Sequence, residues 1–294
     1  MSAINLRGAT VAQGLQDELV HTVATLSARG VTPCLVSVQV GEDDASRIYR
    51  NQQEKKASAL GIAYRRIDLA SELSDAQLHE QLQALNSDPA IHGVILQTPL
   101  PPGLDLNAAQ SCLDPIKDVD GVTEANLGAV MTGRPGLYPS TALSAFELIR
   151  ATGISLKGKE AVVIGRSAIV GKPVGMLLLN ERVTVTMCHT GTQAAGLLES
   201  HVRRAEILVV AVGQPETVPG AWVRNNAIVI DVGINEVEGG LVGDVEFAAA
   251  AERAAYITPV PGGVGPLTVT MLLRNTLLAA RLQTEIDTLS LSKY

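Results

Sequence analysis

The chain has 294 residues and a formal net charge of −7; 46% of its residues are hydrophobic and only 3% are aromatic. This length suggests about two domains, and a core of Val, Leu, Ile and Ala is typical of parallel sheets covered by helices. No block of lysine and arginine is present to bind a phosphate backbone, and no apolar run approaches the ~20 residues that span a bilayer. Neither nucleic acid nor a membrane is therefore an expected partner.

Signals for export, disulfides and metal binding are also missing. The N-terminal residues include no apolar segment before a cleavage site, which predicts a cytoplasmic protein. The cysteines, Cys34, Cys112 and Cys188, are widely spaced and odd in number, and the histidines show no ligand spacing. We therefore expect no disulfide framework and no metal site.

The first half of the chain alternates helical and strand patterns. The predicted elements are helices over 10–29, 44–60 and 74–85 and strands over 34–40, 62–69 and 93–97. This βαβαβ order is typical of a parallel sheet. Three prolines in 98–103 stop the last strand, which predicts a rigid loop at the carboxyl end of the sheet. Gln97 and residues 99–101 would there meet a ligand.

A second alternation follows a linking helix over 142–151. The predicted elements are strands over 161–164, 183–187, 207–212 and 227–232 and helices over 170–179 and 193–202. A last helix over 264–282 is expected to return to the first domain. The predicted fold class is therefore α/β with two lobes.

The segment between strand 161–164 and the following helix reads Gly165-Arg-Ser-Ala-Ile-Val-Gly-Lys-Pro173. Glycines at such a junction let the backbone approach a phosphate, and the helix N-terminus supplies N–H groups and positive dipole. It is not a P-loop, because five residues separate the glycines and Pro173 replaces the required Ser or Thr. An ordinary strand-to-helix turn is the alternative interpretation.

The next strand indicates which dinucleotide would bind. It ends in Met187-Cys-His-Thr-Gly191, without the acidic residue that binds the ribose hydroxyls in NAD-specific sites. A carboxylate would repel a 2′-phosphate, whereas Arg166 and Thr190 offer charge-assisted and hydroxyl hydrogen bonds. The pattern favours NADP over NAD.

Three polar or rigid features remain. Tyr49 and Gln53 share one face of the helix over 44–60, although a tyrosine on an amphipathic helix is more often part of the core. Asp118 and Asp120 fit either a donor-rich heterocycle or a simple turn. The segment 258–268 contains three glycines and three prolines, which implies a fixed backbone that something approaches closely.

Six segments together resemble the bifunctional methylenetetrahydrofolate dehydrogenase/cyclohydrolase family, in the family's order and over nearly the whole chain. They are 41–49, 97–101, 117–121, 165–173, 231–235 and 259–266. The resemblance implies an N-terminal α/β folate lobe over 1–141 plus 270–294, a Rossmann-like NADP-binding lobe over 142–269, and a cleft between them. It also implies a tetrahydrofolate one-carbon derivative as substrate and a homodimer joined through the NADP lobes.

The resemblance also implies roles for individual residues. Tyr49 would stack on the folate, Gln97 would line the reaction centre, and Asp120 would bind the pteridine ring. The further implied substrate-binding residues are Pro99, Leu100, Gly262, Gly263 and Thr268, and the implied cofactor-binding residues are Gly165, Arg166, Ser167, Ile169, Thr190, Val212, Gly213, Gly233 and Ile234.

The chain departs from the family pattern at the catalytic lysine, four residues after the tyrosine, where Gln53 stands. The family's Pro-Cys-Thr-Pro-x-Gly is altered in 139–144, and Gly191 replaces an expected basic residue. An amide does not titrate near neutral pH, so the loss of acid–base help predicts a ~10²–10⁴-fold weaker cyclohydrolase step. Hydride transfer mainly needs the folate and the cofactor to be aligned, so the dehydrogenase activity would be retained. Lys56 is a candidate substitute, but it lies about 60° around the helix from position 53 and ~4.5 Å along it.

The sequence thus predicts an NADP-dependent methylenetetrahydrofolate dehydrogenase whose cyclohydrolase activity is weak or absent. One alternative is an altered folate lobe that serves another substrate in a specialised pathway. Another is a non-catalytic paralogue that binds folate or NADP and regulates a partner. A shikimate-type dehydrogenase shares the architecture, but segments 99–101 and 261–266 fit it poorly.

Overall fold

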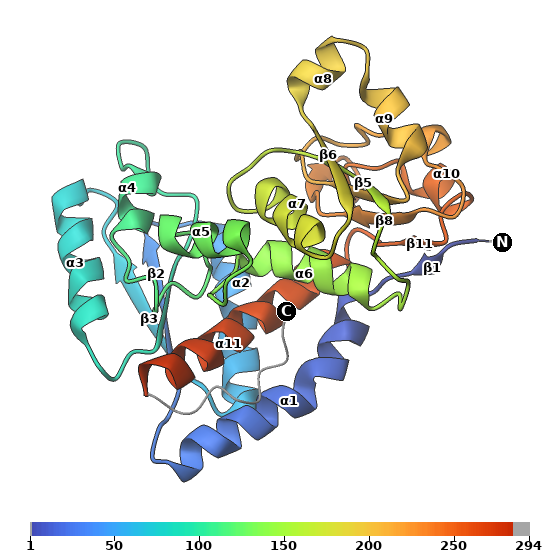
Figure 1. Ribbon diagram of the computed structural model, residues 1–294. Coiled ribbons are helices and arrows are strands. Elements are labelled where there is room, and N and C mark those ends of the chain that lie inside the picture. The colour runs from blue at the N-terminus through green and yellow to red at the C-terminus, as the bar shows by residue number, and fades with distance from the viewer. Residues whose placement is uncertain (1, 285–294) are drawn as a thin grey trace. The chain divides into compact units, whose positions relative to one another are not determined.

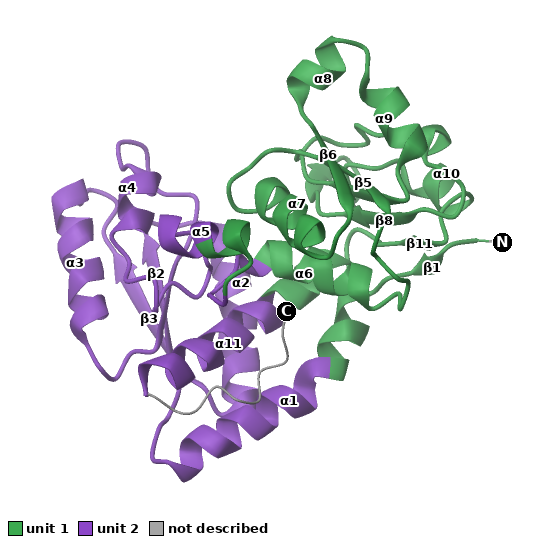
Figure 2. Cartoon of the chain, in the orientation of Figure 1, with its two compact units in different colours: residues 1–14, 129–134, 141–268 green, residues 15–128, 135–140, 269–294 purple. Residues whose placement is uncertain are grey.

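The computed structural model describes residues 2–284, and the chain divides into two compact units (Figure 1, Figure 2). Unit 1 consists of Met1–Gly14, Ala129–Arg134 and Thr141–Thr268, and unit 2 of Leu15–Gly128, Pro135–Ser140 and Val269–Tyr294. The chain passes from one unit to the other within helices such as α1 (Gly8–Ala28) and α11 (Val264–Gln283). Residues 285–294 of the predicted folate lobe lie outside the described residues.

Unit 2 is built on a parallel three-stranded sheet in the order β3-β2-β4. The strands are β2 (Cys34–Val40), β3 (Ala63–Leu69) and β4 (Gly93–Leu96). The further helices that lie wholly or partly in this unit are α2 (Asp44–Leu60), α3 (Asp75–Ser87), α4 (Leu106–Ser111) and α5 (Glu124–Thr132). Strand β2 is central and buried at every position, as a parallel strand covered on both faces should be.

The two faces of β2 differ in chemistry, because successive side chains of a strand point to opposite faces. One face packs on α3 in an apolar cluster that includes Val36 and Leu82. The other face begins with Leu35, in a second apolar cluster formed with residues of α1, α2 and α11. It continues with Ser37 and Gln39, which are buried and polar. A strip of hydrogen-bonding groups therefore lies within the sheet of unit 2.

Helix α2 has a capping residue at each end. The Asp43 side chain accepts a hydrogen bond from the Ser46 amide at 2.7 Å, which satisfies one of the free N–H groups of the first turn. At the other end, Gly61 adopts a left-handed φ of 81°, and its backbone amide donates to the carbonyls of Ala57 and Ser58 in the last turn. These local signals explain why the predicted and observed bounds of this helix agree.

Unit 1 contains a six-stranded sheet in the order β1-β11-β8-β7-β5-β6, with all pairs parallel. The strands are β1 (Ile4–Asn5), β5 (Glu160–Ile164), β6 (Thr184–Cys188), β7 (Ile207–Val210), β8 (Ile228–Asp231) and β11 (Tyr256–Ile257). The chain runs from β5 to β6 at one edge and then returns past β5 to β7. The carboxyl ends of β5 and β7 thus form a switch point, the usual ligand site of such sheets.

Helices and one hairpin complete unit 1. They are α6 (Ser140–Arg150), which begins in unit 2, α7 (Gly171–Asn180), α8 (Thr190–Ala194), α9 (Leu198–Arg204), the 3₁₀ turn η1 (Gly220–Trp222), α10 (Phe247–Ala251), and the antiparallel strands β9 (Asn235–Val237) and β10 (Gly240–Val242).

The predicted α/β class with parallel sheets is confirmed, but two details differ. The single helix expected over 193–202 is wrong: Gly196 takes a left-handed φ of 71° and separates α8 from α9. Residues 1–14, expected in the folate lobe, group with unit 1 because β1 pairs with β11. Segment 129–134 also groups with unit 1, where Asn180 donates a hydrogen bond to the Val130 carbonyl at 3.1 Å.

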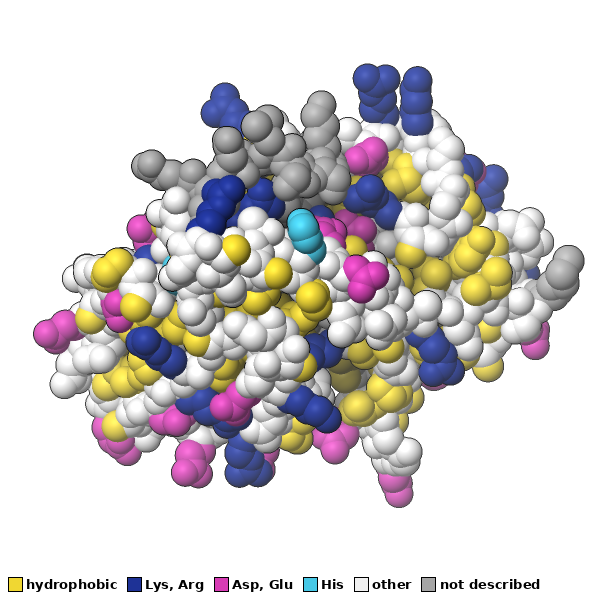
Figure 3. Space-filling model, turned by 90° about the horizontal axis from the view of Figure 1, so that it is seen from below, with side chains coloured by type: hydrophobic (Ala, Val, Ile, Leu, Met, Phe, Trp, Pro, Cys, Tyr) yellow, Lys and Arg dark blue, Asp and Glu magenta, His cyan; other side chains and the backbone are white. Residues whose placement is uncertain are grey.

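Charges of both signs lie on one face of the described residues. Figure 3 shows basic and acidic side chains intermingled over the face that it draws, with no continuous basic stripe. Within residues 2–284, no helix combines the length and apolar composition needed to cross a bilayer.

Candidate active site and cofactor site

Tyr49, Gln53 and Lys56 follow one another along one face of α2. Tyr49 is half-buried and packs on the apolar cluster around Leu35, the role expected of a core tyrosine. Burial, and secondarily the charge of Asp120, raises the pKa of the Tyr49 hydroxyl far above its usual value. The ring is therefore neutral across the physiological range.

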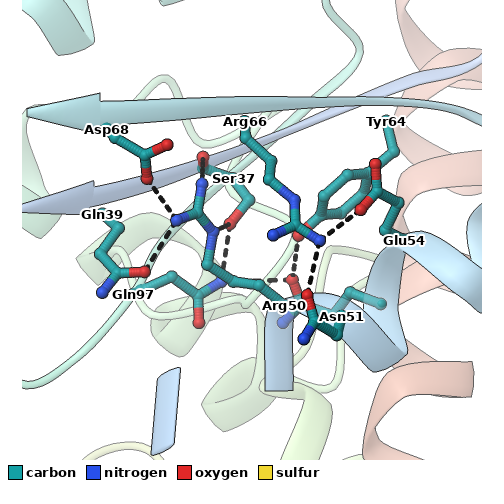
Figure 4. A network of polar contacts seen from close by, with 10 residues as sticks. Ser37, Gln39, Arg50, Asn51, Glu54, Tyr64, Arg66, Asp68 and Gln97 are labelled. Atoms are coloured by element: carbon teal, nitrogen blue, oxygen red, sulfur yellow. Dashed lines mark hydrogen bonds and ion pairs between the residues drawn. The ribbon is translucent and has the colours of Figure 1, made fainter. Parts of the chain in front are cut away.

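Gln53 is fully buried within a network of polar side chains in unit 2. Its Oε1 accepts hydrogen bonds from the Tyr64 hydroxyl at 2.8 Å and from Gln97 Nε2 at 3.2 Å. Gln97 Nε2 also donates to Ser37 Oγ at 3.0 Å, and Figure 4 shows these side chains together. Gln53 Nε2 makes no hydrogen bond with any described residue. Because an unsatisfied buried donor costs about 1–3 kcal/mol, this amide is suited to donate to a ligand.

The loop after β4 accounts for three predicted substrate residues. Gln97 is 5% exposed and directly contacts Gln53, a contact that the sequence did not predict. Pro99 is exposed, whereas Leu100 is half-buried against the apolar cluster on the α3 side of the sheet. The structure thus brings Gln97, but not Leu100, into the polar network.

The segment 117–121 gives its charged residues different tasks. Lys117 Nζ donates to two backbone carbonyls at the end of α3, at 3.1 and 2.7 Å. Asp118 is fully buried and accepts two backbone amides, at 2.9 and 2.8 Å, and Asn126 Nδ2 at 2.9 Å. Burial, with a smaller effect of Asp118, raises the pKa of Asp120 to about 6. Asp118 thus holds its own loop, and Asp120 is the carboxyl group suited to a ligand.

Lys56 has a defined contact with α11. Its Nζ donates to Thr270 Oγ1 on α11 at 3.3 Å, and burial lowers its pKa. This contact links Lys56 of α2 with α11.

The turn after β5 in unit 1 requires its glycines. Gly165 has a φ of 123°, and a Cβ on it would lie 2.3 Å from the Ala211 carbonyl oxygen. A Cβ on Gly171 would lie 2.2 Å from the Gly165 oxygen. Ser167 Oγ accepts from two amides at the start of α7, at 3.1 and 3.3 Å, and Arg166 is exposed. The predicted Gly-rich turn therefore lies at the switch point, with the N-terminus of α7 behind it.

The end of β6 presents no carboxylate. Cys188 is buried, and the exposed His189 uses Nδ1 to accept the Gly191 amide at 3.1 Å. Thr190 is exposed at the start of α8. This environment does not repel a 2′-phosphate.

Asp244 organises the loop after β7, a role that sequence reasoning missed. It is fully buried and accepts the amides of Val212 at 2.7 Å, Gly213 at 3.0 Å and Gln214 at 3.0 Å. It also accepts Asn235 Nδ2 at 2.9 Å. The available signal was a lone acid within the otherwise apolar Leu-Val-Gly-Asp-Val stretch.

A second buried acid, Asp231, lies at the end of β8. Its oxygens accept the amides of Gly233 at 3.0 Å, Asp244 at 3.0 Å and Val245 at 2.8 Å. Burial nevertheless raises its pKa to about 7. Gly233 is required because its Cβ would lie 2.1 Å from Asp244 Oδ1, while the neighbouring Ile234 is 60% exposed.

The predicted residues of segment 258–268 belong to unit 1 by their contacts. The Gly262 carbonyl accepts the Gly8 amide at 3.0 Å, and a Cβ on Gly263 would lie 2.7 Å from the Pro259 oxygen. Thr268 is buried and donates to the carbonyl four residues earlier at 3.3 Å. The backbone is fixed as expected, and the substrate contacts of these residues stay a prediction.

The fold and these groups define an α/β enzyme with a dinucleotide-binding unit. One family model, described as the tetrahydrofolate dehydrogenase/cyclohydrolase catalytic domain, matches residues 6–120. A second, described as the NAD(P)-binding domain of the same enzymes, matches residues 139–284. The chain belongs to the tetrahydrofolate dehydrogenase/cyclohydrolase family, and the predicted resemblance is confirmed.

Relatives and solved structures agree with this assignment. The bifunctional protein FolD of Pelobacter propionicus is 48% identical over 275 residues, which cover 93% of this chain and 96% of that protein. The bifunctional FolD structure from Campylobacter jejuni has a TM-score of 0.92 at 36% identity and covers 96% of this chain and 99% of that chain. FolD from Trypanosoma brucei, complexed with NADP cofactor and inhibitor, has a TM-score of 0.90 at 39% identity, covering 98% and 100%.

Proposed function

We propose that this protein oxidises 5,10-methylenetetrahydrofolate to 5,10-methenyltetrahydrofolate with NADP, and that it hydrolyses the methenyl product weakly or not at all. Family membership supports the reaction class, and the NADP complex of the Trypanosoma brucei relative supports the cofactor. The single observation that carries the second half is the burial of the Gln53 amide, which stands where the resemblance to the family implies a lysine.

The unit 1 site fits NADP on geometric grounds. Gly165 and Gly171 are required by the tight turn itself, which leads into the N-terminus of α7, where backbone N–H groups suit a phosphate. Arg166 and Thr190 are exposed and suit the 2′-phosphate, and Asp244 holds the amides of the loop after β7. Bound NADP supplies the hydride acceptor.

The dehydrogenase step asks little acid–base chemistry of the protein. The hydride leaves the methylene bridge as a two-electron unit, and the resulting cation is stabilised by the two folate nitrogens. The protein therefore has to orient the folate, by the Tyr49 ring, the Gln53 Nε2 donor and the Asp120 carboxyl group. None of these roles requires a lysine.

The hydrolysis step differs, because water must lose a proton as it adds to the methenyl carbon and the leaving nitrogen must gain one. The Gln53 amide does not titrate near neutral pH, and both of its oxygen lone pairs face donors, from Tyr64 and Gln97. Lys56 Nζ donates to Thr270 Oγ1 at 3.3 Å. The loss of acid–base help predicts a step slower by about 10²–10⁴-fold.

The test supplies methylenetetrahydrofolate and NADP and follows methenyl formation and methenyl decay separately. We expect NADPH-coupled formation, with decay at the rate measured without enzyme. Accelerated decay would remove the monofunctional proposal but leave the dehydrogenase. Binding of NADP without turnover of any folate would favour the alternative in which the enzyme acts on another substrate. The altered segment 139–144 is the reason for considering that alternative. Binding of both ligands without chemistry would favour the regulatory alternative.

Three further assignments are part of the same proposal. They are the division of folate and NADP binding between 1–141 plus 270–294 and 142–269, a homodimer, and a cytoplasmic location. Size-exclusion chromatography with light scattering tests the dimer, and limited proteolysis with and without NADP tests the division.

A further inference from the structure

Asn275 is a buried amide on α11 that the proposed reaction does not use. It is 0% exposed and lies in the part of α11 that belongs to unit 2. Its Nδ2 donates to the backbone carbonyl of Val119 at 2.8 Å and to that of Tyr138 at 2.9 Å. One side chain thus ties the segment that carries Asp120, and the neighbouring segment 135–140, to α11.

We propose that Asn275 is a positioning residue for Asp120: it holds the peptide bond that precedes Asp120 and thereby sets the direction in which the carboxyl group meets the folate. The proposal rests on the proposed function, in which the Asp120 carboxyl group orients the folate. Asn275 acts through backbone carbonyls, so its role is to position another residue and not to take part in the chemistry.

The orientation of the Asn275 amide is fixed by its partners. A backbone carbonyl can only accept, so both hydrogens of the NH₂ group must point at the Val119 and Tyr138 oxygens. Turning the amide over would set its oxygen against two other oxygens. Oδ1 has no hydrogen-bond partner among the described residues, so no contact there favours the reversed amide.

The contact with Val119 matters because a peptide bond is planar. The Val119 carbonyl and the Asp120 amide belong to one peptide plane, so holding the carbonyl holds that plane. The plane after Asp120 is held separately. Its carbonyl accepts the Ser140 amide at 3.3 Å. Its amide, that of Gly121, donates to Asp118 Oδ1 at 2.9 Å. With both planes held, the backbone angles of Asp120 are set, and the direction of its side chain from the backbone follows.

The contact with Tyr138 lies where two backbones meet without a side chain between them. Gly121 has a φ of 71°, and a Cβ on it would lie 2.4 Å from the carbonyl carbon of Tyr138. A shift of the backbone at Tyr138 would therefore press on Gly121, the residue next to Asp120. Because Asn275 donates to both backbones at this close approach, it also holds their spacing.

Gln283 is a matched control on the same helix. Its Nε2 donates to the His92 carbonyl at 2.7 Å and to the Ile116 carbonyl at 3.4 Å. It is thus another amide of α11 that holds two backbone carbonyls of unit 2, but neither carbonyl belongs to a peptide plane of Asp120. Gln283→Met should remove contacts of the same kind and leave folate binding within about twofold of the unsubstituted protein.

The experiment is a double-mutant cycle between Asn275→Leu and Asp120→Ala. It measures the Kd of tetrahydrofolate by titration calorimetry and KM for methylenetetrahydrofolate and for NADP. Asn275→Leu keeps a branched side chain and removes both donors. It should weaken folate binding about tenfold, the typical worth of one hydrogen bond to a charged group, and leave KM for NADP unchanged. In the Asp120→Ala background the positioned group is absent, so the same substitution should change folate binding by less than about twofold.

Two results would overturn the proposal. One is an equal loss of folate binding in both backgrounds, which would show that Asn275 supports the fold in general. The other is unchanged folate binding by an Asn275→Leu variant whose circular dichroism shows it to be folded. If Asn275→Leu does not fold, Asn275→Ser takes its place in the cycle; it keeps one hydroxyl donor, so a loss of about threefold is expected and the same two results decide.

Failure of the proposed function is a separate outcome. If the unsubstituted protein binds tetrahydrofolate but does not oxidise methylenetetrahydrofolate, the proposed reaction is excluded. The calorimetric cycle then still decides whether Asn275 acts through Asp120, because it measures binding and not turnover.

Discussion

Asp244→Asn should destabilise the folded chain, because four N–H donors face the two oxygens of this fully buried side chain. Oδ2 accepts the Val212 and Gly213 amides at 2.7 and 3.0 Å. Oδ1 accepts the Gln214 amide at 3.0 Å and Asn235 Nδ2 at 2.9 Å. Whichever oxygen becomes an NH₂ group, two donors then face a donor, and turning the amide does not help.

The magnitude follows from those two lost pairs. A hydrogen bond to a charged group contributes about 1.5–3 kcal/mol, so two represent roughly 3–6 kcal/mol. Relief of repulsion between Asp244 and Asp231 offsets part of this, since their charges interact. A net loss of about 2–4 kcal/mol in the free energy of unfolding is expected. NADP binding should also weaken, because the amides of 212–214 lose their orientation.

Urea denaturation followed by the fluorescence of Trp222 measures this loss. Trp222 is the single tryptophan of the chain and lies in η1 of unit 1. With a slope of about 2 kcal/mol per molar urea, the midpoint should fall by about 1–2 M at unchanged slope. A parallel NADP titration follows binding.

Glu246→Gln is the matched control in the same unit. Glu246 Oε2 accepts the Gly220 amide at 2.9 Å, and a glutamine keeps one oxygen for that amide. This variant should stay within about 0.5 kcal/mol of the natural protein. If Asp244→Asn also stays within that range, the account of the buried carboxyl group is refuted.

Three further predictions follow from burial and close approach. Because the Asp231 pKa is raised to about 7, the folded chain holds a proton that the unfolded chain releases; this stability is complete below about pH 4 and is lost as pH rises through 7. Asp231→Asn should reduce the decline seen in urea denaturation by up to about 1.4 kcal/mol per pH unit, and an unchanged slope would refute this. For Asp120, with a pKa of about 6, kcat/KM for methylenetetrahydrofolate should fall as pH drops through 6, and Asp120→Asn should give a lower, flat profile; a retained inflection would exclude this group. Gly165→Ala should lose about 2–5 kcal/mol and NADP binding, because its Cβ would meet the Ala211 oxygen at 2.3 Å; stability equal to the natural protein would contradict this.

Local patterns were sufficient for the long elements. Strand β2 and helix α2 have the predicted bounds, because period and capping residues such as Asp43 are encoded within a few neighbours. The two-residue strands β1 and β11 show no period at all, and Gly196 breaks a helical pattern whose apolar residues continue on both sides. Such features depend on pairing and backbone angles that a short window does not contain.

The sequence by itself determined the α/β class, the helix face that carries Tyr49 and Gln53, and the absence of an acid after β6. Only the tertiary structure decided that Gln53 joins Tyr64 and Gln97, and that Ser37 accepts hydrogen bonds from both Arg50 and Gln97. These partners come from α2, β2, β3 and the end of β4, and strand register sets which of them meet. A hydrogen-bond direction depends on every donor and acceptor in reach, so it is a property of packing and leaves no spacing in the sequence.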